Sequence, residues 1–493
     1  MNLPRAGRTS SRTLLAWGTP YLILSIWSIF TATNISRLRP ISGDEVGYLD
    51  PAINLVTEGH FYSTAWWQPA NQFFAANLPF HALISSGWFM LFGPGLAQGR
   101  LLSLALFFTG TVLILEALRR GKILTTSWQT VLFTLLWLCG LYSQSISQFA
   151  RPEGLCLLIL SIYFFAWTLK SRVACYLTVG FCGVAAALTG LQMVAAFALY
   201  SLLAIGANIR KGLVVSSFLV LGGLLGTAAV IALYTWKDVL PVFLTSTFGL
   251  GANRAQWHGF RDPALWALTA LGLFILVRSR SHLSPTVKKA LFLGTIGTPL
   301  VAAGLFLLSK FPQYYCFFAL LPIVIGISSA APLAWPRMRR IDKLATGGLL
   351  TVAAVGFPLY LVYFLNTYNQ RDLSQIDRFC LEHVSQSSII FCDPGVYFSA
   401  KPIARKVFTQ FYLSKASGED RASITTVILL SRNAPPYIDE KAVRASLGGE
   451  WKPIGAIDLE ATQPPIFPSL GFLKRLSYLQ PYNFTAWDIQ HHR

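Results

Sequence analysis

Two adjacent carboxylates, Asp44 and Glu45, follow the first long apolar segment of the chain and are the residues best placed to do chemistry. An ionised carboxylate can accept the proton of an attacking hydroxyl group, which is general base catalysis. Ser42 stands three residues before Glu45, and this spacing predicts a capping box, in which both side chains bond to free amides at the start of a helix. Asp44 is then the carboxylate left for chemistry.

The residues around this pair predict a helix that lies on a membrane surface. It begins near Gly43, after the capping box, and Gly59 is a natural stop. Apolar residues recur every three or four positions, so one side is apolar, while Asp44 and Tyr48 share another side. Pro51 lacks an amide donor and is expected to kink or split the helix. The alternative is an interfacial helix whose acids only favour the positive end of the helix dipole.

The composition indicates a polytopic membrane protein. The 493 residues are 54% hydrophobic and 12% charged, whereas about a quarter of a soluble domain is charged. The net charge of +19 does not point to nucleic acid, because 26 Lys and Arg oppose 9 Asp and Glu in residues 1–365 and only 14 oppose 12 afterwards. The basic excess therefore belongs to membrane topology. The first apolar run is long and lacks a small-residue cleavage site, so no cleaved signal sequence is expected.

Eleven apolar segments are predicted to cross the membrane. Of the 26 basic residues, 18 precede the first segment or lie in alternate loops, and seven of the nine acids lie in the opposite loops. The positive-inside rule then places the N-terminus in the cytoplasm, and an odd number of spans places the C-terminus outside. The predicted spans are residues 14–33, 100–118, 126–143, 153–169, 173–189, 191–207, 213–234, 263–277, 290–309, 315–333 and 344–365.

The first outer loop, residues 34–99, is long enough to carry structure of its own. Residues 77–95 are rich in aromatic side chains, with Pro79 near their start, and predict a second interfacial helix. His81 is either a ligand or base, or a structural residue among aromatic neighbours. The structural reading is favoured, because nothing near it supplies a second ligand.

Cations in the other outer loops are candidates to bind a phosphate group. Arg151 and Glu153 form either an exposed ion pair, worth less than about 1 kcal/mol, or part of the same cavity as Asp44. Residues 236–262 mix cations and aromatic side chains, which suits a phosphate beside a lipid tail. The alternative for that loop is anchoring at the bilayer surface.

After residue 365 the composition turns ordinary and predicts a small α/β domain, residues 366–493, outside the membrane. Cys380 and Cys392 are either a disulfide or two buried thiols. The chain shows no nucleotide-binding loop, no Ser/His/Asp arrangement, no metal-ligand cluster and no repeat. Helices are expected at 371–386 and 437–447, and strands at 388–392, 425–430 and 451–459.

Five short motifs, ordered along the membrane region, resemble the lipid-linked-sugar glycosyltransferases of the C-type (GT-C) fold. The similar branch is the bacterial one that resembles protein mannosyltransferases and aminoarabinose transferases. Relatives often carry Glu-Lys-Pro-Pro where this chain has Ala-Asn-Leu-Pro at 76–79. The motifs are G-D-E-V-G-Y at 43–48, N-L-P-F-H at 77–81, L-F-G-P-G-L-A-Q-G-R-L at 91–101, A-R-P-E at 150–153, and S-K-F-P-Q-Y-Y at 309–315 with L-L-P at 320–322.

The resemblance implies a fold of membrane helices and gives the motif residues their roles. The catalytic carboxylate of the first loop corresponds to Asp44, the Arg-x-acid element to Arg151 and Glu153, and the Lys before the Tyr pair to Lys310. The predicted site comprises catalytic Asp44, Glu45 and Glu153; donor-phosphate ligands Lys310, Arg151, Arg261, Tyr314 and Tyr315; and positioning residues Tyr48, His81 and His258.

The predicted function is transfer of one sugar from a polyprenyl-phosphate donor to a hydroxyl group of a glycan, lipid or protein. The reaction takes place at the outer face of the cell (inner) membrane, in the transmembrane domain of residues 1–365, and a single displacement inverts the anomeric centre. No cofactor is required, and a divalent metal ion is an alternative. The competing predictions are a transporter or flippase of lipid-linked sugars, and a polysaccharide ligase or polymerase of related fold.

Overall fold

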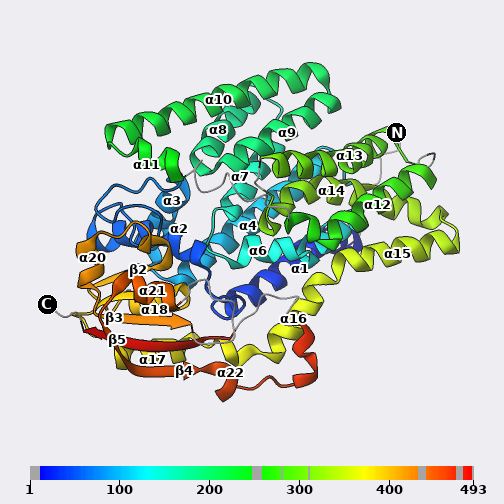
Figure 1. Ribbon diagram of the computed structural model, residues 1–493. Helices are drawn as coiled ribbons and strands as arrows, with labels where there is room; N and C mark the ends of the chain where they lie inside the picture. The colour runs from blue at the N-terminus through cyan, green and yellow to red at the C-terminus, as the bar shows by residue number, and fades with distance from the viewer. Residues whose placement is uncertain are drawn as a thin grey trace, which may run out of the picture.

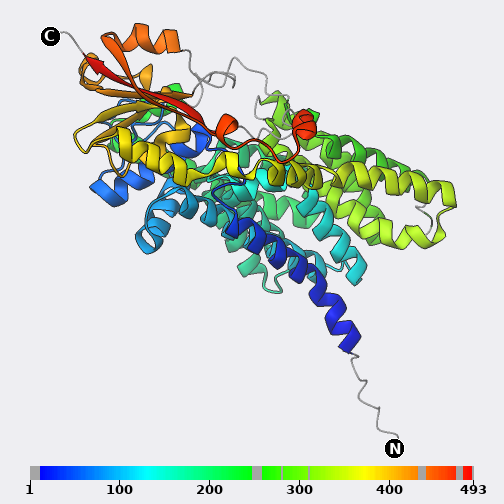
Figure 2. The same ribbon diagram turned by 90° about the horizontal axis from the view of Figure 1, so that it is seen from below.

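The computed structural model describes residues 11–246, 258–278, 281, 283–308, 311–430, 440–473 and 481–490. Apolar helices make up most of it, and the C-terminal part forms one five-stranded sheet (Figure 1). Figure 2 shows that the sheet lies on one side of the molecule, while the N-terminal end of α1 (Ser11–Thr33) extends toward the opposite side.

The helices are those of an integral membrane protein. Among the described residues, five are long and apolar enough to cross a membrane, or up to seven spans if each of two bent pairs is one span. A helix lies in each of the eleven predicted segments, but the count of eleven spans stays a prediction. The five are α4 (Leu96–Arg120), α8 (Arg172–Thr189), α10 (Ile209–Trp236), α13 (Pro285–Leu307) and α14 (Cys316–Ala334) with the short turns η4 (Gln313–Tyr315) and η5 (Trp335–Arg337) at its ends; shorter apolar helices are α3 (Phe80–Phe92), α7 (Glu153–Ala166), α9 (Leu191–Ala207) and α12 (Pro263–Arg278).

Two predicted spans are bent instead of straight. The segment 126–143 contains α5 (Ser127–Cys139) and α6 (Leu141–Gln148), which meet at 71°, and the segment 344–365 contains α15 (Arg340–Ala354) and α16 (Gly356–Asn366), which meet at 43°. The first break falls at Gly140, where the backbone is extended and a Cβ atom would lie 2.1 Å from the Tyr142 ring.

The helix that carries the two carboxylates is α2 (Gly43–Glu58), and its capping box is confirmed. The Glu45 amide donates to Ser42 Oγ at 3.2 Å, and the Ser42 amide donates to Glu45 Oε2 at 3.0 Å. Gly59 ends the helix with φ of +75°, a conformation that suits glycine. Of the two alternatives predicted for Pro51, a kink or a split, the split is wrong, because α2 runs through this residue as one helix with buried neighbours on both sides.

The sheet has the strand order β2-β1-β3-β5-β4. The predicted strands at β1 (Ile389–Cys392), β3 (Thr426–Leu430) and β4 (Glu450–Asp458) are confirmed, whereas β2 (Lys406–Thr409) and β5 (Asn483–Gln490) were not expected. Strand β1 pairs in parallel with β2 and β3, and β5 pairs antiparallel with β3 and β4. Helices around the sheet include α17 (Leu373–His383), α18 (Pro394–Ala400), α19 (Gln410–Leu413), α20 (Gly418–Ser423), α21 (Glu440–Leu447) and α22 (Leu459–Thr462).

The sheet is docked on the first loop through buried polar contacts. Asp50 accepts hydrogen bonds from the Thr64 amide at 2.6 Å and from the Tyr397 hydroxyl. Thr64 Oγ1 in turn donates to the Val407 carbonyl of β2 at 2.6 Å. Apolar residues of α2 and of the sheet belong to one hydrophobic cluster, which also holds Cys380 and Cys392 as free buried thiols. The disulfide alternative is therefore wrong, and α2 is held from the C-terminal side as well as from the membrane helices.

Candidate active site

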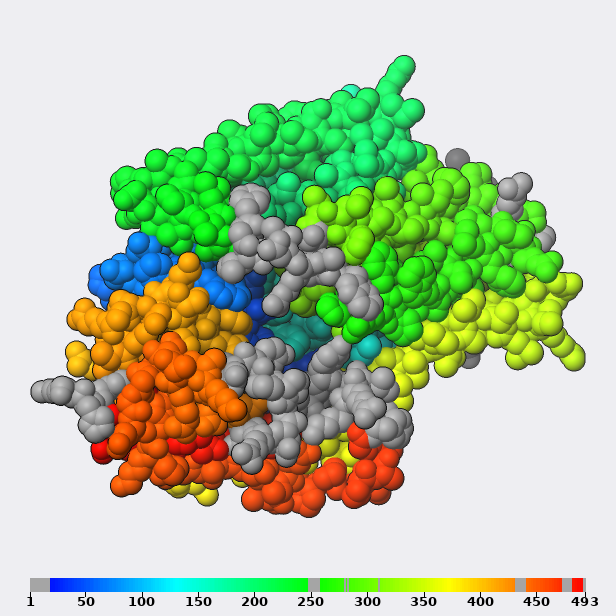
Figure 3. Space-filling model, in the orientation of Figure 1, coloured from blue at the N-terminus to red at the C-terminus, as the bar shows by residue number. Residues whose placement is uncertain are grey.

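Asp44 lies at the edge of a cavity of about 500 Å³ between the membrane helices and the sheet. One wall is made by the start of α2, the turn before α7 and the turn η4 before α14; the other wall is made by segments that follow β1 and β2. Figure 3 shows a hollow at this side of the molecule, between the blue first loop, the green helices and the orange C-terminal part.

Arg151 is the cation that organises this cavity. Its guanidinium group contacts Asp44 Oδ2 at 2.8 Å and Glu153 Oε1 at 3.0 Å, and it lies 3.8 Å from the centre of the Tyr314 ring. The Arg151 side chain is 8% exposed and that of Glu153 is 1% exposed, whereas Asp44 is 34% exposed. The prediction of an exposed Arg151–Glu153 pair is therefore wrong. Of the alternative, a cavity shared with Asp44, the structure shows the part that concerns Arg151, whereas Glu153 is buried outside this cavity.

The surroundings of Arg151 hold it in its charged form. Burial by itself lowers the pKa of Arg151, but the facing carboxylates of Glu153 and Asp44 raise this pKa well above its usual value. Glu153 does not line the cavity, and it contacts Arg151 from the protein side. A positively charged guanidinium group thus points at the cavity with one carboxylate behind it and one beside it.

Glu45 lies next to Asp44 in the chain but points into the protein. It is fully buried, and its two oxygens accept hydrogen bonds from the Arg100 side chain, both at 2.8 Å. Glu45 Oε1 also accepts from the amide of Ala150, the residue before Arg151, at 2.9 Å. Glu45 therefore joins the start of α2 to the turn that carries Arg151, a placement that favours positioning over chemistry.

Tyr48, Asn77 and His81 lie close together behind Asp44. Asn77 Nδ2 donates to the Tyr48 hydroxyl at 3.0 Å, and the ring centres of Tyr48 and His81 are 5.7 Å apart. Burial raises the pKa of Tyr48, so its hydroxyl keeps its proton. Both ring nitrogens of His81 are buried without a hydrogen-bond partner among the described residues. No role is predicted for Asn77 from the sequence, and its contact with Tyr48 is seen only in the structure.

Arg39 is a cavity residue that sequence reasoning missed. It is buried, donates to Gln148 Oε1 at 3.3 Å and Gln144 Oε1 at 3.2 Å, and lies 4.4 Å from the centre of the Tyr360 ring. The bend between α5 and α6 brings these glutamines under the first loop. The only sign of Arg39 in the sequence is its position shortly after the first apolar segment.

The remaining predicted residues lie in four different settings. Tyr314 and His258 line the cavity, while Tyr315 is buried beside Tyr314, with ring centres 4.7 Å apart. Arg261 is exposed and does not line the cavity. Lys310 lies outside the described residues. Within the described part of the chain, no three His, Cys, Asp or Glu side chains are grouped to hold a metal ion.

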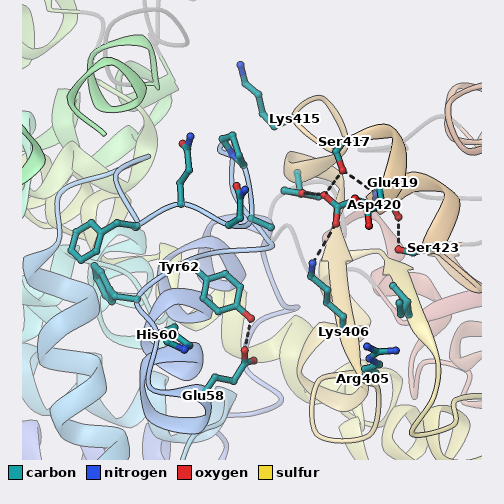
Figure 4. A pocket seen from close by; sticks show the side chains of 18 of the residues that line it. Glu58, His60, Tyr62, Arg405, Lys406, Lys415, Ser417, Glu419, Asp420 and Ser423 are labelled. Carbon is teal, nitrogen blue, oxygen red and sulfur yellow. Dashed lines mark hydrogen bonds and ion pairs between the residues drawn. The ribbon is translucent and has the colours of Figure 1, made fainter. Parts of the chain in front are cut away.

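A second, larger cavity of about 900 Å³ lies between the first loop and the edge strand β2 (Figure 4). In it Tyr62 donates to Glu58 at 2.5 Å, and Lys406 contacts Asp420 at 3.3 Å. Glu58 ends α2 and Asp44 begins it, so the helical rise separates them by about 20 Å. This cavity therefore holds none of the predicted site residues.

The fold is that of a known class of membrane proteins. No family model and no curated protein matches the chain by sequence. ArnT from Cupriavidus metallidurans, bound to undecaprenyl phosphate, superposes with a TM-score of 0.59 at 12% identity over 96% of this chain and 98% of that one. Apo ArnT matches equally, with 11% identity. The chain thus has the fold of ArnT, and the GT-C fold is confirmed. Arabinofuranosyltransferase AftD from Mycobacteria matches at 14% identity over 96% of this chain and 40% of its own, but its TM-score of 0.47 is too low to support an argument.

Proposed function

We propose that this protein is a membrane glycosyltransferase that moves one sugar from a polyprenyl-phosphate donor to an acceptor hydroxyl group. The observation that carries the proposal is the pairing of Asp44 with Arg151 at 2.8 Å in a cavity against the ends of the membrane helices. A base and a phosphate-binding cation in one cavity are what a glycosyl displacement needs. The ArnT structure bound to undecaprenyl phosphate supports a lipid phosphate as donor.

Arg151 is assigned to the donor phosphate. A guanidinium group can bind two phosphate oxygens at once, and each charge-assisted bond contributes roughly 1.5 to 3 kcal/mol. As the bond between the anomeric carbon and the phosphate oxygen breaks, negative charge grows on the phosphate, and Arg151 stabilises it. Glu153 holds the guanidinium group in place from behind, and Arg39 lines the same cavity as a second cation.

Asp44 is assigned as the general base. Its partial exposure lets an acceptor reach it, whereas the neighbouring Glu45 is buried. The acceptor oxygen forms a bond to the anomeric carbon from the face opposite the phosphate, its proton passes to Asp44, and polyprenyl phosphate leaves. A single displacement of this kind inverts the anomeric centre, and a base contributes roughly 10²- to 10⁴-fold to the rate. The site lies at the outer face of the cell membrane on this proposal.

The test is release of polyprenyl phosphate by the purified protein. The protein is incubated with a panel of undecaprenyl-phosphate sugars and a membrane extract as the source of acceptors, and the released lipid phosphate is measured by mass spectrometry. At least one donor is expected to be consumed with transfer of label to an extract component. A protein that binds these donors but only moves them across vesicle membranes would be a flippase, and the proposal would be wrong.

A further inference from the structure

The C-terminal sheet has a feature that usually marks a ligand site. Its parallel core has the order β2-β1-β3, so the chain leaves β1 for the strand on one side and then crosses to the strand on the other. In open α/β sheets, ligands bind outside the carboxyl ends of the strands where the order reverses in this way. Here the reversal lies between β1 and β3.

The carboxyl end of this sheet faces the Asp44 cavity. Asp393 and Gly395, directly after β1, and Gln410 and Phe411, directly after β2, line the cavity together with Leu430 at the end of β3. The cavity therefore has two walls of different character. The wall on the membrane helices carries the cation Arg151, and the wall on the sheet carries a carboxylate, an amide and aromatic rings.

Gln410 and Phe411 pack directly against the start of α2. A Cβ atom at Gly43 would lie 2.5 Å from the Phe411 ring and 3.3 Å from Gln410 Nε2, so only glycine leaves room for them beside Asp44. The Gln410 Oε1 atom is buried and has no hydrogen-bond partner among the described residues. An unpartnered buried acceptor is costly, and a ligand hydroxyl group would satisfy it.

Asp393 supplies a second acceptor on the same wall. One of its oxygens accepts a hydrogen bond from the Gly395 amide at 2.8 Å, which fixes the side chain. Burial raises the pKa of Asp393 to about 6, so the carboxylate is still charged at about pH 7.5. A charged carboxylate accepts strong hydrogen bonds from hydroxyl groups.

We propose that this crevice at the carboxyl end of β1, β2 and β3 binds the hydroxyl groups of the donor's sugar, through Asp393 and Gln410. The inference rests on the proposed function. When the donor phosphate binds to Arg151, the polyprenyl tail of the donor lies toward the membrane helices. The sugar of the donor must then extend toward the sheet. The cavity of about 500 Å³ is in the range of small-ligand sites, which combine aromatic walls with a few orienting polar groups.

The test compares binding of a lipid phosphate with and without its sugar, at about pH 7.5 in detergent. Dissociation constants are measured for undecaprenyl phosphate and for its glucose, mannose, galactose and arabinose conjugates. The wild type is expected to bind at least one conjugate more tightly than undecaprenyl phosphate. The variants Asp393→Asn and Gln410→Met should each reduce that gain by about tenfold while leaving the affinity for undecaprenyl phosphate unchanged.

Matched substitutions elsewhere on the sheet serve as controls. Asp488 and Gln490 are exposed on β5, outside the cavity, so Asp488→Asn and Gln490→Met should keep the full gain. A wild type with no gain for any of the four sugars would overturn the inference. So would Asp393→Asn and Gln410→Met variants that keep the gain but turn over more slowly at saturating donor, because the crevice would then bind the acceptor. A wild type that does not bind undecaprenyl phosphate would instead refute the proposed function.

Discussion

Asp44 and Glu45 are adjacent in the chain but lie in different surroundings. Substitution of the two residues should therefore have different effects on turnover and stability. Asp44→Asn keeps the size of a partly exposed side chain and removes the proton acceptor, so turnover should fall by roughly 10²- to 10⁴-fold with an unchanged melting temperature. Glu45→Gln leaves Arg100 charged and buried, which should cost about 3 to 5 kcal/mol of stability. Turnover and thermal unfolding of both variants are the measurements.

The control for Glu45 is the double variant Glu45→Gln/Arg100→Met, in which no charge is left unpaired. It should recover part of the lost stability, because the buried charge is the main cost. A Glu45→Gln variant that folds normally but is inactive, beside an active Asp44→Asn, would show that Glu45 is the base.

The roles of Arg151 and Glu153 can also be separated by comparing a single variant with a double variant. Arg151→Gln should abolish donor binding and also lower the melting temperature, because Glu153 stays buried without its cation. The double variant Arg151→Gln/Glu153→Gln should regain stability but not activity, since the phosphate ligand is still missing. Measured turnover near the wild-type rate in the double variant would remove Arg151 from the donor site.

At the residue scale, contacts between residues that are close in the chain could be predicted from the sequence better than contacts between distant residues. The capping box could be predicted because Ser42 and Glu45 are three residues apart. The buried partner of Glu45, Arg100, is 55 residues away, and nothing local in the sequence joins the two. The residues around Arg151 predict either an exposed ion pair or a cavity shared with Asp44, and the sequence cannot decide between them, because burial of Arg151 depends on packing between α2, α7 and η4.

At the element scale, α2 is positioned by a close contact at a glycine. A Cβ atom at Gly47 would lie 1.7 Å from the Trp66 ring, so Gly47→Ala should displace α2, cost about 1 to 3 kcal/mol and reduce turnover. Gly87, inside α3, has no atom within 4 Å of its Cβ position, so Gly87→Ala should be neutral or stabilise by about 0.5 to 1 kcal/mol. Melting temperature and turnover of the two variants are compared, and equal behaviour would mean that Trp66 moves freely.

Helices and strands were predicted where a continuous pattern marks them. The apolar segments and strands β1, β3 and β4 follow this rule. Strand β2 has only two apolar residues, Val407 and Phe408, between Lys406 and Thr409, whereas the equally short β1 is apolar throughout. Strand β5 carries Asn483 and Asp488, residues that are uncommon in strands, so neither β2 nor β5 was predicted. The bend at Gly140 was missed because apolar composition does not distinguish a straight span from a broken one.

At the scale of the whole molecule, the sequence supports one orientation of the chain. The basic residues of the alternate loops predict a cytoplasmic N-terminus. In the structure the N-terminal end of α1 and the sheet lie on opposite sides (Figure 2). The Asp44 cavity lies between the sheet and the membrane helices, so the predicted orientation places it on the side of the membrane opposite to the N-terminus.

Two pairs of fusions test this orientation. Alkaline phosphatase is active only outside the cytoplasm, and green fluorescent protein fluoresces only inside it. Each reporter is attached after Arg493. As a control, each is also attached after Lys122, in the loop between α4 and α5. The positive-inside rule predicts phosphatase activity after Arg493 and fluorescence after Lys122, because an odd and an even number of spans precede the two positions. Fluorescence after both would require an even total of crossings. It would place the sheet in the cytoplasm while α4 keeps Asp44 on the outer side, which is incompatible with the contact between the sheet and the first loop and would show that the orientation is wrong.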